Sequence, residues 1–242
     1  TLDEKLARLE EQSVDMVFVE PFTSELAGME AEEFIRRIVH EKIQAALVFV
    51  GFNFHFGKGA TGNVDLLRRE GERLGIKTRE IEPFMSGGQR VSSSVIRKLL
   101  LAGQVGEAAE LLGGYHVIEG PVVEGDGRGR QIGVPTANLA YPQVLVPGMG
   151  VYACWVRIGG REAERLPAAV NIGERPTFGG KKVSIEAHLL EGGRDLYGET
   201  IRVEFVSRLR DEMKFPGPEA LVAQIRADIA AGREFLENAP RL

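Results

Sequence analysis

The sequence predicts two domains, an α/β domain with a parallel sheet followed by an all-β barrel or sandwich that ends in a helix. Apolar runs alternate with amphipathic helical segments up to about residue 113, whereas short β-rich runs separated by Gly, Pro and Asp turns follow it. An apolar stripe at helical spacing begins just after Pro218. A chain of 242 residues can hold two cores, and we place the domains at residues 1–113 and 114–242.

The first half opens with helix and strand patterns in alternation. Residues 2–12 carry leucines at helical spacing, and residues 16–19 form a short apolar run that predicts a buried strand. Residues 31–43 predict a helix with one apolar face, and residues 45–50 predict a second apolar strand. Strand, helix and strand in this order are typical of a parallel α/β sheet.

The rest of the first half continues this pattern. Asn63 is a candidate N-cap for a further helix, and residues 76–81 predict a third strand. Two short helices follow, broken at Gly103 and ending in a glycine pair, as helices commonly do. The domain boundary is therefore predicted near residues 113–115.

The second half is predicted to be β-structure closed by one helix. Its strands are expected at residues 115–123, 150–158, 168–172, 183–190 and 201–205. The final helix is expected from about residue 218 to residue 236, with proline at its start.

Composition narrows the classes of function. The net charge is −5 and no long basic run occurs, which argues against nucleic acid as the main partner. No apolar run approaches the roughly 18 residues that span a bilayer, so we expect a cytoplasmic protein without a membrane partner. The chain begins at Thr1 without an initiator methionine, which suggests a piece of something longer; homo-oligomerisation is left open. Cys154, the single cysteine, is expected to be a small buried apolar residue.

A glycine-rich stretch, GDGRGRQIGVPTANL at residues 125–139, is the first candidate site. Its glycines and arginines precede a Pro-Thr-Ala-Asn sequence, so exposed backbone N–H groups meet a hydroxyl and an amide oxygen. This combination suits a polyphosphate with a hard metal ion. A glycine hairpin without a ligand explains the composition equally well.

Within this stretch, the sequence Pro135 to Asn138 is more specific. Alternation directs Thr136 and Asn138 to the same side, where two neutral oxygens could hold Mg²⁺ already bound to ATP phosphates. The alternative is an Asn/Thr turn that satisfies its own backbone.

A later strand, SIEAHLL at residues 184–190, alternates cleanly. Ile185 and Ala187 are expected to face a core, while Glu186 and His188 face the other way. A carboxylate on an open face is usually only solvated. If this face lies over Thr136, however, Glu186 can act as the base for an alcohol that attacks ATP.

These stretches, taken in order, resemble a known family. GDGRGRQIGVPTANL, PGMGVYACWV, AAVNIGERPTFGG, SIEAHLLEGGRDLYGETIRVEFVSRLRDEMKF and the last helix are similar to the riboflavin kinase module. The earlier stretches VGFNFHFGKGATGN and VSSSVIRKLL are similar to the FMN adenylyltransferase module of the bacterial bifunctional riboflavin kinase/FAD synthetases. The resemblance implies a Rossmann-like nucleotidyltransferase domain followed by a riboflavin kinase β-barrel with a C-terminal helix. It also implies riboflavin, FMN and ATP as substrates, and Mg²⁺ as cofactor.

Carried over by motif, the resemblance assigns roles to individual residues. In the kinase module it implies Glu186 as the base for the ribityl 5′-hydroxyl of riboflavin, and Arg210 beside the flavin. It implies that Thr136 and Asn138 bind the metal and ATP, with the loop that contains Gly125, Gly127 and Gly133 over the phosphates. In the first half, the residues that match flavin-binding positions are Asn53 and Phe56, and those that match a phosphate-gripping motif are Ser93, Ser94 and Arg97. From the residues alone, this serine run could simply cap a helix, and Arg97 could serve in a surface ion pair.

One family motif has no counterpart in the sequence. The adenylyltransferase module of the family begins with a strand and a His-x-Gly-His loop, and the four histidines here are not paired at that spacing. We therefore expect an incomplete first domain that lacks part of its sheet, and a chain that makes FMN but little FAD. Adenylylation of FMN is expected of the full-length protein.

Two other functions fit the barrel less well. A flavin-binding barrel without transfer chemistry would need neither metal ligands nor the base Glu186. A nucleic-acid-binding barrel is disfavoured by the acidic balance and by the absence of interleaved basic and aromatic residues on the strands.

Overall fold

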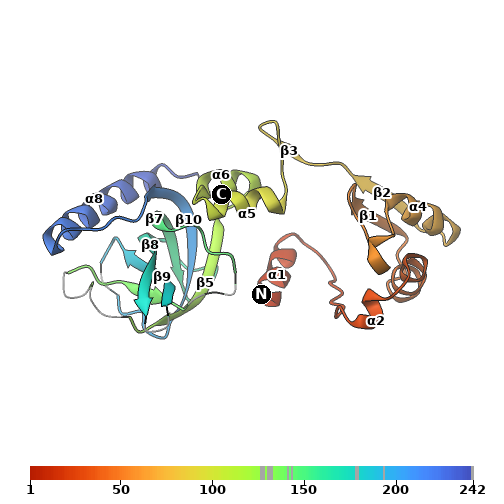
Figure 1. Ribbon diagram of the computed structural model, residues 1–242, viewed down its shortest axis with the longest axis horizontal. Helices are drawn as coiled ribbons and strands as arrows, with labels where there is room; N and C mark the ends of the chain where they lie inside the picture. The colour runs from red at the N-terminus through yellow and green to blue at the C-terminus, as the bar shows by residue number, and fades with distance from the viewer. Residues whose placement is uncertain are drawn as a thin grey trace. The chain divides into compact units, whose positions relative to one another are not determined.

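A computed structural model describes the chain except for residues 126–128, 130–132, 141, 143, 178–179, 193 and 241–242, and the side chains of 175–177 and 180–182. The described residues form two compact units, Thr1–Val91 and Ser92–Leu242 (Figure 1). This division lies before the two helices that precede the barrel, because these helices pack on the barrel. The domain boundary near residues 113–115 stays a prediction.

The first unit is built around a two-stranded parallel sheet. Strand β1 (Leu47–Gly51) pairs with β2 (Lys77–Ile81), and α4 (Val64–Arg73) connects them. The Asn63 side chain accepts a hydrogen bond from the Leu66 N–H at 2.9 Å, which confirms the predicted cap of α4. The predicted strands at residues 45–50 and 76–81 are thus confirmed, as is their parallel pairing.

The remaining elements of this unit are short. They are α1 (Leu2–Glu11), α2 (Ser24–Ala27), α3 (Ala31–Phe34), the π-helix η1 (Ile35–Lys42), the 3₁₀-helix η2 (Lys58–Ala60), and the hairpin β3 (Met85–Ser86) with β4 (Gln89–Arg90). The helix expected at residues 31–43 is therefore present as α3 followed by η1, and it buries Ile35 and Val39.

The strand expected at residues 16–19 is wrong. This segment carries no secondary structure, and Met16 and Phe18 are 71% and 52% exposed. An apolar run becomes a strand only where a second strand satisfies its backbone N–H and C=O groups. In the described part of the chain, β1 pairs with β2 alone and no strand pairs with this segment.

The second unit is a closed antiparallel barrel. Its strands are β5 (His116–Val123), β6 (Ala137–Leu139), β7 (Gly150–Ile158), β8 (Leu166–Thr177), β9 (Gly180–Leu189) and β10 (Thr200–Arg210). Their order around the barrel is β10-β5-β6-β9-β8-β7. The five predicted strands are confirmed, and the structure selects the barrel over the sandwich. The sixth strand, β6, was not among the predicted strands.

Three helices pack on this barrel. Helix α8 (Pro218–Glu237), predicted from the apolar stripe, packs on β7, β8 and β10 (Figure 1). Helices α5 (Ser93–Leu101) and α6 (Val105–Leu112) pack on each other, and α6 also packs on β5 and β10. Among the described residues, no helix is long and apolar enough to cross a membrane.

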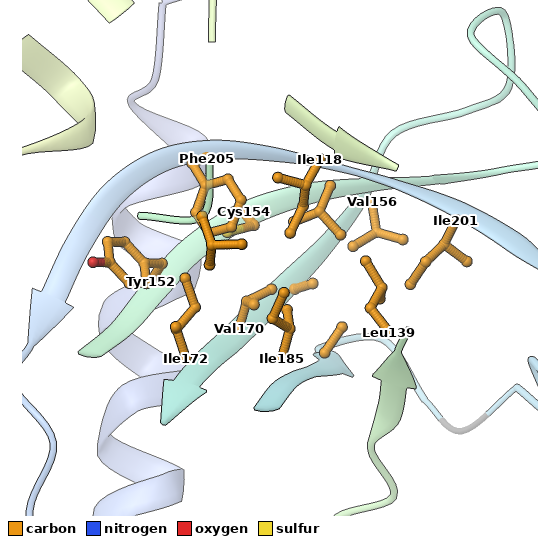
Figure 2. Packing of buried hydrophobic residues seen from close by; sticks show 14 of the residues in the cluster. Ile118, Leu139, Tyr152, Cys154, Val156, Val170, Ile172, Ile185, Ile201 and Phe205 are labelled. Atoms are coloured by element: carbon orange, nitrogen blue, oxygen red, sulfur yellow. The ribbon is translucent and has the colours of Figure 1, made fainter. Parts of the chain in front are cut away.

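The barrel interior is filled by aliphatic and aromatic side chains from every strand. Figure 2 shows Ile118, Leu139, Val156, Val170 and Ile185 packed together with other members of this cluster. Leu100, Val105 and Ala108, from α5 and α6, belong to the same cluster. Cys154 is fully buried in it, as predicted, and burial raises the pKa of its thiol well above the usual value. The barrel is therefore a packed scaffold with its interior filled by side chains.

Candidate functional site

Strands β6 and β9 bring the two main candidate segments together. They pair antiparallel, so that Asn138 stands opposite Glu186. The Thr136 hydroxyl oxygen lies 3.5 Å from Oε2 of Glu186, at the outer limit of hydrogen bonding, although 50 residues separate them in sequence. The hydroxyl, the amide and the carboxylate are thus gathered at one edge of the barrel.

The alternation predicted for β9 is confirmed. Ile185 and Ala187 are 1% and 2% exposed and face the core, whereas Glu186 and His188 are half-buried and line a cavity on the other side. Because side chains alternate between the two faces of a strand, Glu186 and His188 both face that cavity.

Glycines lie directly against Thr136 and Asn138. A Cβ atom at Gly125 would lie 2.6 Å from Cγ of Asn138, so only glycine fits there without displacing that amide. A Cβ at Gly129 would collide with the Val134 carbonyl oxygen and lie 3.3 Å from the Thr136 hydroxyl. Gly125 and Gly129 therefore lie close against the Asn138 amide and the Thr136 hydroxyl.

Two other glycines of the stretch differ from these. Gly133 has a φ of +77° and nothing within 4 Å of a Cβ, so its backbone conformation is what requires glycine. Gly127, which the resemblance places over the phosphates, lies outside the described residues.

Of the two cavities that Thr136 lines, the larger one lies beside Glu186 and has a volume of about 300 Å³. Its polar lining includes Thr136, Glu186, His188 and Arg210. Its apolar lining comes from the barrel, from the segment after β10 and from α8: Val151, Ala169, Met213, Phe215, Leu221 and Ile225. A cavity lined by both polar and apolar side chains suits a ligand that combines a ring system with a hydroxylated chain.

A smaller cavity of about 50 Å³ is also lined by Thr136. Thr136 and Asn138 line it together with Arg194, Asp195 and Tyr197. Thr136 thus lines both cavities.

Arg210 is held in the larger cavity by helix α8. Its guanidinium makes a bidentate pair with Asp228, at 2.7 Å between Nη2 and Oδ2 and 2.9 Å between Nε and Oδ1. Gln224 donates a further hydrogen bond to Asp228 at 2.9 Å. Because Asp228 is only 6% exposed, this pair fixes the guanidinium in one orientation.

The candidates in the first unit are not arranged as one cluster. Asn53 is exposed, and its carbonyl oxygen lies 3.0 Å from Nδ1 of His55. Phe56 is 7% exposed, with its ring 5.4 Å from that of Phe34 and 5.3 Å from that of Phe54, so it is a core residue of this unit.

The serine and arginine candidates lie at the start of α5, in the second unit. Ser93 and Ser94 are exposed in its first turn, and Arg97 is exposed one turn later. The capping residue is Ser92, whose hydroxyl accepts from the Val95 N–H at 3.4 Å. The capping explanation therefore applies to Ser92, and it leaves Ser93 and Ser94 without a capping role.

The side-chain oxygens at this site suit a metal ion that takes most of its ligands from phosphate and water. Thr136, Asn138 and Glu186 offer oxygens, the ligand type that Mg²⁺ prefers. In the described part of the chain, no group of three or more His, Cys, Asp or Glu residues could hold a metal ion by itself. The residues therefore fit a hard divalent ion delivered with a nucleotide, and they do not fit a protein-only metal cage.

Several residues that line the larger cavity had no site role predicted from the sequence, among them Asp228, Phe215 and His188. Asp228 and Phe215 lie in the chain after β10, where helical periodicity and composition carried no sign of the cavity. His188 lies two residues after Glu186 on the same face of β9, and this spacing was a usable signal.

Comparison with known proteins gives two family matches. The Flavokinase family (riboflavin kinase) matches residues 112–236, and the FAD_syn family (FAD synthetase) matches residues 1–95. Together they cover both halves of the chain in the order that the resemblance implied.

Individual relatives agree with these matches. The bifunctional riboflavin kinase/FMN adenylyltransferase of Escherichia coli (strain K12) is 38% identical over 234 residues, which are 97% of this chain and 74% of that relative. The enzyme of the same name from Bacillus subtilis (strain 168) is 33% identical over 242 residues, 98% of this chain and 75% of that relative. The fold also matches a crystal structure described as a macrolide-efflux protein from Streptococcus pneumoniae, with a TM-score of 0.87, 30% identity and coverage of 96% of this chain and 74% of that one.

Proposed function

The chain belongs to the bifunctional riboflavin kinase/FMN adenylyltransferase family, and from this premise we propose that the edge of the barrel at β6 and β9 is its kinase site. Members of the family act in flavin cofactor biosynthesis: riboflavin is phosphorylated to FMN, and FMN is adenylylated to FAD. Riboflavin, FMN and ATP are therefore the substrates of this chain. Because ATP is a co-substrate, we place its action in the cytoplasm.

The phosphates of ATP bind at Thr136, Asn138 and the glycines that cover them. Supporting this are the close approach of Gly125 to Asn138 and of Gly129 to Thr136, which leaves backbone rather than side chains around the two oxygens. Gly127 and Gly133 complete this loop in the proposal. The two activities use ATP, generally with a divalent metal; here Thr136 and Asn138 hold Mg²⁺, which when bound neutralises phosphate charge.

Glu186 is the general base. It accepts the proton of the riboflavin 5′-hydroxyl as the hydroxyl oxygen attacks the γ-phosphorus and the bond to the bridging oxygen of ADP breaks. The observation that carries this proposal is the 3.5 Å separation of the Thr136 hydroxyl and the Glu186 carboxylate, with Thr136 shared by the two cavities. Donor and acceptor of the phosphoryl group then meet beside the carboxylate.

Riboflavin occupies the larger cavity, with its ring system against the apolar lining and its ribityl chain toward Glu186. Arg210 lies beside the flavin, in the orientation that its bidentate pair with Asp228 imposes. An apolar pocket with few, fixed polar groups favours a planar ring over a flexible polar ligand.

For adenylylation of FMN we propose roles for the earlier candidates. Ser93, Ser94 and Arg97 contact phosphate, supported by their exposure at the start of α5, where backbone N–H groups add to the attraction for anions. Asn53 contacts the flavin through its exposed side chain. Phe56 supports that site from the core, since its ring packs against Phe34 and Phe54.

The variant Glu186→Gln tests the kinase site. It keeps the size of the side chain and removes the base, so turnover of riboflavin should fall by about 10² or more. Riboflavin affinity, measured by quenching of flavin fluorescence, should stay within about twofold of the wild type, because the contacts that bind the substrate in its ground state are unchanged.

Glu191→Gln is the matched control, since Glu191 is an exposed carboxylate in the turn after the same strand. It should retain turnover. Equal turnover in Glu186→Gln and the wild type would remove Glu186 from the mechanism. A wild type that binds riboflavin but does not phosphorylate it would instead make the barrel a flavin-binding module without transfer chemistry.

A further inference from the structure

His188 ties the segment before β6 to strand β9. Its Nδ1 lies 2.8 Å from the carbonyl oxygen of Pro135, a residue 53 positions earlier in the chain. A carbonyl oxygen only accepts hydrogen bonds, so Nδ1 carries the proton and donates. Pro135 has no N–H, and its carbonyl is the hydrogen-bonding group that it offers here.

This bond is made at the point where the backbone ladder ends. The pairs between β6 and β9 run from Leu139 with Ile185 to Ala137 with Ala187. One step further, the register would set Thr136 opposite His188, and no backbone pair is formed there. The imidazole therefore extends the attachment of this segment beyond the last rung of the sheet.

Thr136 is thus fixed from both sides. On one side Ala137 is paired with Ala187 in the sheet, and on the other side the carbonyl of Pro135 is bound to His188. Glu186 and His188 project from the same face of β9, and both line the larger cavity. The distance between the Thr136 hydroxyl and the Glu186 carboxylate therefore depends on a bond that His188 makes.

We propose that His188 is a positioning residue of the kinase site: it clamps the turn at Pro135 so that the Thr136 hydroxyl is held against the Glu186 carboxylate. This inference rests on the proposed kinase function. A side chain that orients another ligand or base typically changes activity about 10- to 100-fold when removed, because misplacement of about 1 Å is costly at a reacting centre.

Three variants test the clamp. His188→Ala removes the donor, and His188→Asn keeps an N–H at a similar distance from the backbone. His116→Ala is the control, because the His116 ring also bonds a carbonyl, that of Leu145 at 2.8 Å, but lines neither cavity.

The first readout is steady-state kinetics of riboflavin phosphorylation with a Mg²⁺ titration. His188→Ala should lower kcat at least tenfold and raise the Mg²⁺ concentration for half-maximal rate at least threefold, with KM for riboflavin within twofold. His188→Asn should recover kcat to within about threefold of the wild type, and His116→Ala should stay within twofold. Unchanged kcat and metal dependence in His188→Ala, or no recovery in His188→Asn, would overturn the proposal.

The second readout does not need activity. Amide hydrogen exchange in β6 should quicken at least tenfold in His188→Ala and return toward the wild-type rate in His188→Asn. If the wild type fails to phosphorylate riboflavin, the proposed function fails, while exchange in β6 still tests the clamp. Equal exchange rates in His188→Ala and the wild type would refute it.

Discussion

Single side chains at the edge of the barrel show how much of this site depends on contacts between distant residues. Glu186 could be selected from the sequence because alternation in β9 separates it from the core residues on either side. The tethering role of His188 could not, because its partner, the Pro135 carbonyl, belongs to a segment 53 residues away. Local patterns report the face of a strand on which a residue lies, and tertiary structure decides what it meets there.

The Arg210–Asp228 pair gives a stability prediction at this scale. Asp228→Asn should lower the free energy of unfolding by about 3 kcal/mol, since it leaves a largely buried guanidinium without its countercharge. Urea unfolding followed by the fluorescence of Trp155, the single tryptophan, reports on the barrel alone.

Asp211→Asn is the control for this change. Asp211 pairs with Arg208 at 2.8 Å but its side chain is 80% exposed, so the loss should be under about 0.5 kcal/mol. An equal loss of unfolding free energy in the two variants would mean that the Arg210–Asp228 pair stabilises the barrel no more than an exposed ion pair does.

Among the elements of the barrel, strand β6 is the one that sequence patterns did not predict. It is three residues long and lies in a Pro-Thr-Ala-Asn sequence whose residue types favour turns. It exists because β5 and β9 satisfy its backbone from both sides. The opposite error occurred at residues 16–19, where apolar composition predicted a strand but no partner strand is described. Both errors have one cause, since strand formation depends on non-local pairing.

The glycine-rich stretch yields a prediction about this element. Gly125→Ala should reduce riboflavin phosphorylation about tenfold, because the added methyl group must displace the Asn138 amide. Kinase rates and Trp155-detected unfolding, measured together, separate this local effect from a general loss of stability.

Gly114→Ala provides the comparison. A Cβ there has nothing within 4 Å and the backbone is not in the left-handed region, so activity should be unchanged. Wild-type activity in Gly125→Ala would argue against a tight cover over Asn138.

For the whole molecule, composition and element order were sufficient to predict two domains and their kinds, an α/β domain and a barrel with a C-terminal helix. Periodicity does not reveal which body a helix packs on. Helices α5 and α6 follow the α/β elements in sequence, yet Leu100, Val105 and Ala108 are buried in the core of the barrel. The compact units therefore divide at residues 91 and 92, whereas the change in pattern along the sequence occurs near residue 114.

Fragments of the chain test this difference. A fragment of residues 92–242 should fold cooperatively and retain riboflavin phosphorylation, because it keeps the complete cluster around the barrel. A fragment of residues 114–242 should unfold at a markedly lower urea concentration, because it lacks the buried side chains of Leu100, Val105 and Ala108. Burial of a side chain as large as leucine or valine contributes about 1.5–3 kcal/mol to the free energy of unfolding. Equal midpoints for the two fragments would show that α5 and α6 contribute little to the barrel.

Transfer of the γ-phosphate of ATP to riboflavin tests the central claim most directly. The chain is incubated with riboflavin, Mg²⁺ and ATP labelled in the γ-phosphate, and the flavins are separated. We predict that the label appears in FMN in step with the formation of ADP, and that Glu186→Gln abolishes most of it. Label released only as inorganic phosphate, with riboflavin unchanged, would contradict the account of the β6–β9 edge as a kinase site.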